Sequence, residues 1–172
     1  MNNNILFVCT GNTCRSIIAQ GIFKKILKEK VENSGRYNIQ SAGISAISGM
    51  SPTFEAITVM FEQGIDIAQH QAQPLWEDLV KKADLILVMA NEHQEYILRK
   101  FPFVQNKVFL LKKFALKNEF RSIQNNDKNY EIVDPIGRPI EFYRIIAKEL
   151  KVNLEKIVDV IVEENSRTGG DM

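Results

Sequence analysis

The residues with the clearest chemical potential lie near the start of the chain, where residues 9–16 have the sequence CTGNTCRS. Five residues separate Cys9 from Arg15, and Ser16 follows directly. A backbone turn of this length that leads into a helix can aim its N–H groups at one point, which makes a binding site for phosphate. Arg15 adds a planar guanidinium that matches two phosphate oxygens.

The same positive field would stabilise a thiolate at Cys9, and the hydroxyl of Ser16 could donate a hydrogen bond to it. A thiolate beneath a bound phosphoryl group is a nucleophile already in position. Gly11 and Asn12 suit the turn, since glycine reaches conformations closed to other residues and asparagine tolerates the left-handed region. We therefore predict transfer of a phosphoryl group to Cys9, followed by hydrolysis. The rest of the predicted phosphate-binding loop comprises Thr10, Gly11, Asn12, Thr13, Cys14 and Ser16.

A simpler interpretation of each residue has to be weighed. A cysteine at a strand end is usually an inert core residue, a Gly-Asn pair is usually a turn, and an arginine at a helix start is usually a surface charge. The spacing between Cys9 and Arg15 also occurs by chance. Its position between a buried strand and an amphipathic helix is much more specific, and this context favours the phosphate loop.

Phosphoryl transfer also requires a proton for the departing atom. The strongest candidate donor is Asp134, in the segment Val133-Asp134-Pro135-Ile136-Gly137 just before the last helix. The alternative is an ordinary Asp-Pro turn without a catalytic role. No metal site is expected, because the two cysteines have no matching ligand pair and the only histidines are His70 and His93. No other cofactor is expected either.

Strand-like and helix-like segments alternate along the chain. Apolar runs predict strands over residues 5–8, 37–41, 84–89 and 108–111. Helical periodicity predicts helices from residue 16 onward, over 52–64 with Pro52 in the first turn, over 75–82 and 92–100, and a last long helix whose apolar face runs from Phe142 to Ile161. The alternation predicts an α/β fold, with one three-layer domain built on a parallel sheet that helices cover on both faces.

Ligands of such sheets bind beyond the carboxyl ends of the strands, which is where Cys9 is expected. In the predicted helix over 52–64, the apolar residues are Phe54, Ile57 and Phe61, and Gly64 suits its end. Residues 117–130 are polar and predict an exposed loop. The domain is expected over residues 1–166, with a disordered tail at 167–172.

Composition narrows the function classes. The chain has 172 residues, a formal net charge of +1, 45% hydrophobic residues and 25% charged residues. Without a basic excess, a dedicated nucleic-acid or membrane-surface binder is not expected. Two cysteines do not make a disulfide framework, and the start of the chain lacks the pattern of a signal peptide. No run approaches the ~18 apolar residues that cross a bilayer. These features predict a cytoplasmic protein.

Over nearly all of its length, the chain resembles the low-molecular-weight cysteine phosphatases. The matching segments, in family order and spacing, are VCTGNTCRS at 8–16, SAGI at 41–44, HQAQPLWEDLVKKADLILVM at 70–89 and DPIG at 134–137. The resemblance implies a four-stranded parallel sheet, with Cys9 as nucleophile, Arg15 as phosphate ligand and Ser16 as support for the thiolate. It also implies that Asp134 is the general acid that later activates water.

Other roles rest on the same resemblance. Asn12, Ser41 and His70 match positions that support the loop from behind through hydrogen bonds. Cys14 matches a second loop cysteine that can pair with the nucleophile under oxidation, which predicts a reversible, protective Cys9–Cys14 disulfide. The alternative for Cys14 is a small packing residue.

The substrate preference is expected to depend on three positions. Many tyrosine-directed members resemble GNICRSP, with Ile at Thr13, whereas the bacterial arginine phosphatases have a loop like this one. A threonine hydroxyl can contact a guanidinium. Tyrosine-directed members also tend to place aromatic residues near Ile47 and Ile136, where this chain is aliphatic, although some arginine-directed members carry Phe at Ile136. Phosphoarginine is therefore favoured over phosphotyrosine.

The expected partners are a phosphorylated protein or peptide as substrate and inorganic phosphate as product. Arsenate reductases share the fold and a similar loop, but they need a further cysteine pair that this sequence lacks. A non-catalytic phosphoprotein-binding module would be expected to lose the nucleophile or the acid. This chain retains both Cys9 and Asp134.

Overall fold

A central parallel sheet organises the molecule in the computed structural model, which describes residues 3–117 and 129–168. Within the described residues the sheet has four strands in the order β2-β1-β3-β4, and all three neighbouring pairs are parallel. The strands are β1 (Asn4–Cys9), β2 (Asn38–Gly43), β3 (Leu85–Val88) and β4 (Val108–Leu110). The predicted sheet is thus confirmed, with β1 inside it and Cys9 at its carboxyl end.

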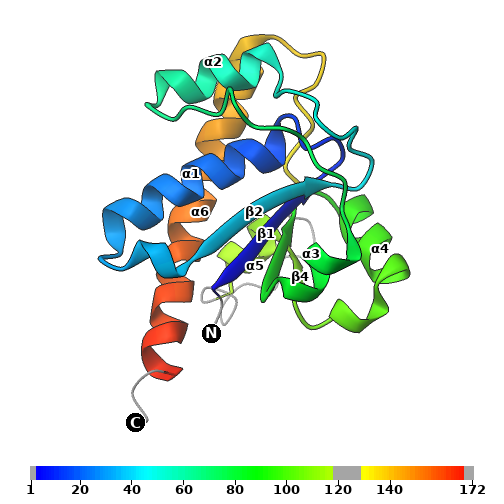
Figure 1. The fold of residues 1–172 in the computed structure, drawn as a ribbon. Helices are drawn as coiled ribbons and strands as arrows, with labels where there is room; N and C mark the ends of the chain where they lie inside the picture. Colours follow the sequence, from blue (N-terminus) through cyan, green and yellow to red (C-terminus); the bar gives the residue numbers. More distant parts are fainter. Residues whose placement is uncertain (1–2, 118–128, 169–172) are drawn as a thin grey trace.

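Helices cover both faces of the sheet (Figure 1). The helices are α1 (Arg15–Lys30), α2 (Phe54–Glu62), α3 (Glu77–Lys82), α4 (Asn91–Lys100), α5 (Leu111–Ala115) and α6 (Ile140–Thr168). The described part of the chain also contains two short 3-10 turns, η1 (Ser34–Arg36) and η2 (Pro102–Val104).

The alternation of side chains along β1 explains the three layers. Ile5, Phe7 and Cys9 belong to the core shared with α1, α2, α5 and α6, while Leu6 and Val8 belong to the core shared with α3 and α4. Successive residues of a strand point to opposite faces, so an unbroken apolar run is what a strand buried on both sides requires. The run of residues 5–8 fulfils this requirement.

Helix α2 differs from its prediction. Pro52 precedes the helix, and Thr53 caps it by accepting a hydrogen bond at Oγ1 from the Ala56 amide (3.2 Å). Phe54 and Phe61 lie on its outer side with 77% and 75% of their surface exposed. The buried contacts come from Ala56, Val59 and Met60, and of the predicted apolar residues only Ile57 packs, partly buried, against the core.

Other boundaries differ by a few residues. Strand β4 ends at Leu110, and α5, which the sequence analysis missed, begins at once with Leu111. Helix α6 extends to Thr168, two residues into the segment expected as a tail, and residues 169–172 lie outside the described residues. Most of the loop predicted over 117–130 also lies outside them. Gly64, with φ +71°, follows α2 as predicted.

Candidate active site

The sulfur of Cys9 is held at the junction of β1 and α1. Cys9 is the last residue of the strand and is buried. Its Sγ lies 3.0 Å from Ser16 Oγ and accepts a hydrogen bond from the Asn12 amide at 3.3 Å. Ser16 is also fully buried, in the first turn of α1. The predicted contact between Ser16 and the sulfur is therefore present, together with a backbone donor.

Asn12 is the centre of the support behind the loop. It has the left-handed φ of +57° and is completely buried. Its Nδ2 donates to Ser16 Oγ and to Ser41 Oγ, both at 2.9 Å. Its Oδ1 accepts from the amide of Gln73 at 3.0 Å, and His70 Nε2 lies 3.1 Å from both Oδ1 and the Asn12 carbonyl oxygen. The structure thus brings Asn12, Ser41 and His70 together, as the resemblance implied.

The His70 ring supplies a neutral donor to this network. Burial is the main cause that lowers the pKa of His70, the charge of Lys24 adds to the effect, and the hydrogen bond with Asn12 opposes it. Both oxygens of Asn12 are acceptors, so Nε2 must carry the proton. His70 therefore stabilises the loop from outside as an uncharged side chain.

The loop requires a glycine at Gly43, at the end of the neighbouring strand, and not at Gly11. Gly11 does not have a positive φ; within the described chain the left-handed non-glycine residue is Asn12. Gly43, at the end of β2, is the glycine that the loop requires. A Cβ on Gly43 would lie 2.5 Å from the Thr10 carbonyl oxygen and 2.9 Å from the Asn12 amide nitrogen. Close approach of two backbones thus fixes the loop against β2.

Arg15 is buried, with 3% of its surface exposed, and its guanidinium faces the loop and the segment before α6. Nη1 donates to the Ile132 carbonyl at 3.1 Å. Nη2 donates to Asp134 Oδ2 at 2.6 Å and to Thr10 Oγ1 at 3.3 Å. Among the described residues, Arg15 Nε is buried and has no hydrogen-bond partner. A buried donor of this kind calls for a ligand, and a guanidinium edge matches phosphate.

Asp134 reaches Arg15 from a tight turn. The preceding segment is tied to the end of β3 because the Ile132 amide donates to the Met89 carbonyl at 2.7 Å. Asp134 Oδ1 accepts from the Ile136 amide at 3.1 Å, which fixes the carboxylate within its own turn. The Asp134 side chain remains 42% exposed. The carboxylate therefore stands between solvent and the buried guanidinium.

Cys14 lies beside the same carboxylate as a neutral thiol. It is buried, and its Sγ donates to Asp134 Oδ1 at 3.9 Å. Burial, followed by the charges of Cys9 and Asp134, raises the pKa of Cys14 to about 12. Both cysteines are free thiols here. The nucleophile is thus expected at Cys9, and the reversible disulfide stays a prediction.

The three predicted specificity positions border the loop. Thr13 is buried, and its carbonyl accepts from the Thr53 amide at 3.0 Å, which joins the loop to α2. Ile47 is 67% exposed in the segment after β2, where the amides of residues 44 and 45 bond to the carbonyls of Cys9 and Thr10. Ile136 is 55% exposed beside Asp134. Both isoleucines therefore expose their side chains to solvent, and we refer to these two positions as the rim of the site.

Sequence reasoning missed two polar groups of the site. Gln73 anchors the loop support, since its Nε2 also donates to the Ser41 carbonyl at 2.9 Å. His93 is completely buried and contacts Thr10 Oγ1 through Nε2 at 2.9 Å. No spacing rule connects these residues with the loop. The sequence offered only the position of His93 near the start of a helix that follows a predicted strand.

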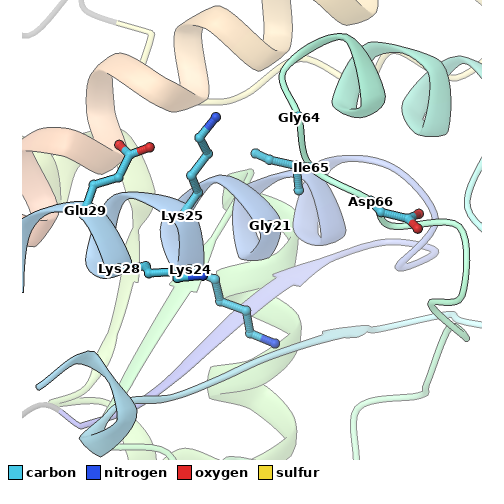
Figure 2. Close-up of a pocket in the computed structure, with 8 residues that line it drawn as sticks. All are labelled: Gly21, Lys24, Lys25, Lys28, Glu29, Gly64, Ile65 and Asp66. Carbon is cyan, nitrogen blue, oxygen red and sulfur yellow. The ribbon is translucent and has the colours of Figure 1, made fainter.

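A separate cavity of about 650 Å³ lies between α1 and the segment after α2. Its lining contains Lys24, Lys25 and Lys28 together with Glu29 and Asp66. In Figure 2, Lys24 and Lys25 extend from α1 in opposite directions, so their ammonium groups do not converge. Mixed charge and diverging side chains make this cavity a poor match for a phosphate group.

In residues 3–117 and 129–168, no group of three His, Cys, Asp or Glu side chains is arranged to hold a metal ion. No helix in the same ranges has the length and apolar character needed to cross a bilayer.

Comparisons with known proteins give a consistent result. A family model described as low molecular weight phosphotyrosine protein phosphatase matches residues 4–167. A protein-arginine-phosphatase of Bacillus subtilis is 34% identical over 154 residues, which cover 90% of this chain and 93% of that protein. A low molecular weight protein-tyrosine-phosphatase of Acinetobacter johnsonii is 41% identical over 115 residues, which cover 67% of this chain and 76% of that protein.

Solved structures give the same picture of the fold. The arginine phosphatase from Geobacillus stearothermophilus superimposes with a TM-score of 0.80 at 30% identity. The match covers 95% of this chain and 96% of that one. The two chains therefore share the complete architecture.

Proposed function

The chain belongs to the low molecular weight phosphotyrosine protein phosphatase family, and from this we propose that it hydrolyses phosphorylated protein side chains through a phosphocysteine at Cys9, with phosphoarginine preferred. The observation that carries the proposal is the pairing of two groups. The sulfur of Cys9 is held by Ser16 and the Asn12 amide, and the buried guanidinium of Arg15 keeps Nε without a partner among the described residues. A tetrahedral dianion fits between such groups.

In the first step, the Cys9 sulfur attacks phosphorus. The S–P bond forms as the bond from phosphorus to the leaving nitrogen or oxygen breaks, and the Asp134 carboxyl gives that atom its proton. Arg15 has to turn its donor edge toward the phosphoryl oxygens, which displaces Asp134 from the contact that it makes at 2.6 Å. Once it is released from the guanidinium, the Asp134 carboxylate, which is 42% exposed, takes up a proton from solvent and becomes available as the acid.

In the second step, the Asp134 carboxylate takes a proton from water. The water oxygen bonds to phosphorus, the S–P bond breaks, and inorganic phosphate leaves. The pair of bonding electrons returns to sulfur, where Ser16 and the Asn12 amide stabilise the thiolate. No metal or redox cofactor is required for either step.

The preference for phosphoarginine rests on the loop and its rim. Thr13 offers a hydroxyl where an isoleucine would offer none, and a guanidinium can donate to it. Ile47 and Ile136 present exposed aliphatic side chains, which cannot stack on a phenyl ring as aromatic residues do. Relatives that are 34% and 32% identical are protein-arginine-phosphatases. Phosphotyrosine is the second candidate, because other relatives are protein-tyrosine-phosphatases.

The test compares hydrolysis of two matched peptides, one with phosphoarginine and one with phosphotyrosine. We expect a higher kcat/KM on phosphoarginine, no turnover by Cys9→Ser, and a shift toward the aryl phosphate in Thr13→Ile. Equal relative rates for wild type and Thr13→Ile would contradict the role of Thr13. Stoichiometric binding of either peptide without turnover would contradict the phosphatase itself and indicate a binding module.

The reducing cytoplasm is the setting that we propose, since a free nucleophilic thiol persists there. An arsenate reductase activity is not supported. Its disulfide relay needs a further cysteine pair, and the chain contains only Cys9 and Cys14.

A further inference from the structure

His93 is a completely buried polar side chain that the reaction described above does not use. It lies in the first turn of α4, directly beyond the carboxyl end of β3, and strands β3 and β1 are neighbours. This topology places the imidazole beside the residue that follows Cys9. The two ring nitrogens contact two different groups.

The contacts of His93 fix its tautomer. Nδ1 lies 3.0 Å from the amide nitrogen of Ala90, which can only donate, so Nδ1 carries no proton. The proton of the neutral ring must then be on Nε2, which lies 2.9 Å from Thr10 Oγ1. His93 therefore accepts from the start of α4 and donates to the phosphate-binding loop.

Thr10 connects this donor with the phosphate ligand. Its Oγ1 also accepts from Arg15 Nη2 at 3.3 Å. A hydroxyl oxygen has two lone pairs, so these two N–H donors use both of them. The Thr10 oxygen is consequently held in one orientation, and it in turn holds one branch of the Arg15 guanidinium.

The surroundings keep this ring neutral. Arg15 and Asp134 face it from the loop and from the segment before α6, and Glu92 Oε1 lies 3.5 Å from Nε2 on its own helix. Burial, followed by the charge of Arg15, lowers the pKa of His93 to about 4, and Asp134 opposes the shift only in part. Glu92 is largely exposed, so solvent screens its effect.

We propose that His93 is a positioning residue for phosphoryl transfer. Its Nε2–H orients Thr10 Oγ1, and Thr10 Oγ1 holds the Arg15 guanidinium in the orientation that binds the phosphoryl group on Cys9. The proposal deepens the proposed function and rests on it. It assigns His93 no contact with substrate. Its contribution is the fixed geometry of a phosphate ligand, for which small displacements are costly in rate.

Two substitutions separate this role from the contribution of His93 to the helix. In His93→Asn the side-chain oxygen can still accept from Ala90, but the amide stops one atom short of Thr10. In His93→Gln the amide nitrogen stands as many bonds from the backbone as Nε2 does, so donation to Thr10 is kept and the contact with Ala90 is lost. The two variants therefore each keep one of the two hydrogen bonds.

We expect His93→Asn to lower kcat, and to weaken the binding of inorganic phosphate, by about tenfold, as loss of one hydrogen bond implies. His93→Gln should stay within about threefold of wild type in both measurements while losing more thermal stability. In Thr10→Val the effect of His93→Asn should disappear, because the intermediate group is missing. Equal losses of phosphate binding in the Asn and Gln variants would overturn the proposal.

Two readouts keep this inference separate from the proposed function. The chain has two histidines, so ¹⁵N shifts of the imidazole nitrogens can be assigned with a His70 variant. An unprotonated Nδ1 and a protonated Nε2 are expected for His93, and the opposite tautomer would refute the inference whatever the enzyme hydrolyses. A wild type that binds phosphate but turns over no phosphopeptide would refute the proposed function alone.

Discussion

Replacement of Gly43 by alanine is a direct test of how the loop is held. Gly43 ends β2, and its amide and carbonyl already bond to the carbonyl of Gln73 and the amide of Leu75, at 3.0 and 2.9 Å. The added methyl group cannot be accommodated by a backbone shift on this side without breaking those bonds. The loop of Thr10 and Asn12 would have to move instead.

The size of the effect follows from three contacts. The new Cβ would lie 2.5 Å from Thr10 O, 2.9 Å from Asn12 N and 2.9 Å from Ala46 Cβ. Two of these atoms belong to the backbone of the phosphate-binding loop, so no flexible side chain can relieve the clash. Overpacking of this kind costs about 1–3 kcal/mol of stability. A loop displaced by about 1 Å should lose on the order of 100-fold in rate.

The assay combines thermal unfolding with kcat/KM on a phosphopeptide. Gly35→Ala is the matched control, because a Cβ there meets nothing within 4 Å. We expect Gly43→Ala to lower Tm by about 2–4 °C for each kcal/mol lost and to lose most of its activity. Gly35→Ala should change neither quantity. Wild-type activity in a well-folded Gly43→Ala would refute the argument that close backbone approach fixes the loop.

Three further outcomes can be measured. Asp134→Asn should lower kcat by about 10²–10⁴-fold, since the general acid is lost, and a near-normal kcat would exclude that role. Asn12→Ala should lower the free energy of unfolding by more than Asn12→Gly does, by about 1–2 kcal/mol in chemical denaturation, because only alanine resists the left-handed φ; equal losses would refute this. The His93 ring stays neutral in the folded state down to a pKa of about 4, whereas the unfolded ring binds its proton near the ordinary 6.5. Stability from this group is therefore complete above about pH 6.5 and falls by up to about 3 kcal/mol as the pH is lowered toward 4, and His93→Gln should lack that part of the slope.

The sheet could be predicted because its strands are buried on both faces. In a short segment, an unbroken apolar run such as residues 5–8 indicates a strand that is buried on both faces. The exposed positions of Phe54 and Phe61 could not be predicted in this way. A helix that packs through Ala56, Val59 and Met60 leaves larger apolar side chains outside, and the sequence pattern does not say which of two apolar stripes is buried.

For the site, spacing along the chain predicted which residues of the loop lie together, but it did not predict contacts between segments that are far apart in the sequence. Cys9, Arg15 and Ser16 lie within one turn and one helix start, so their proximity follows from the loop itself. Asp134 became a strong candidate only through the family resemblance. His93 contacts Thr10 across 83 positions of the chain, and only the pairing of β1 with β3 brings them together.

The ion pair between Arg15 and Asp134 has a consequence for how the enzyme treats anions in general. Every tetrahedral oxyanion that seeks the guanidinium competes with a carboxylate already bound there at 2.6 Å. A small oxyanion therefore binds less well against this competition than a phosphopeptide that also gains contacts at the rim. After hydrolysis, once Asp134 has released its proton to solvent, its carboxylate competes with free phosphate for Arg15. This competition favours release of the product and reduces inhibition by it.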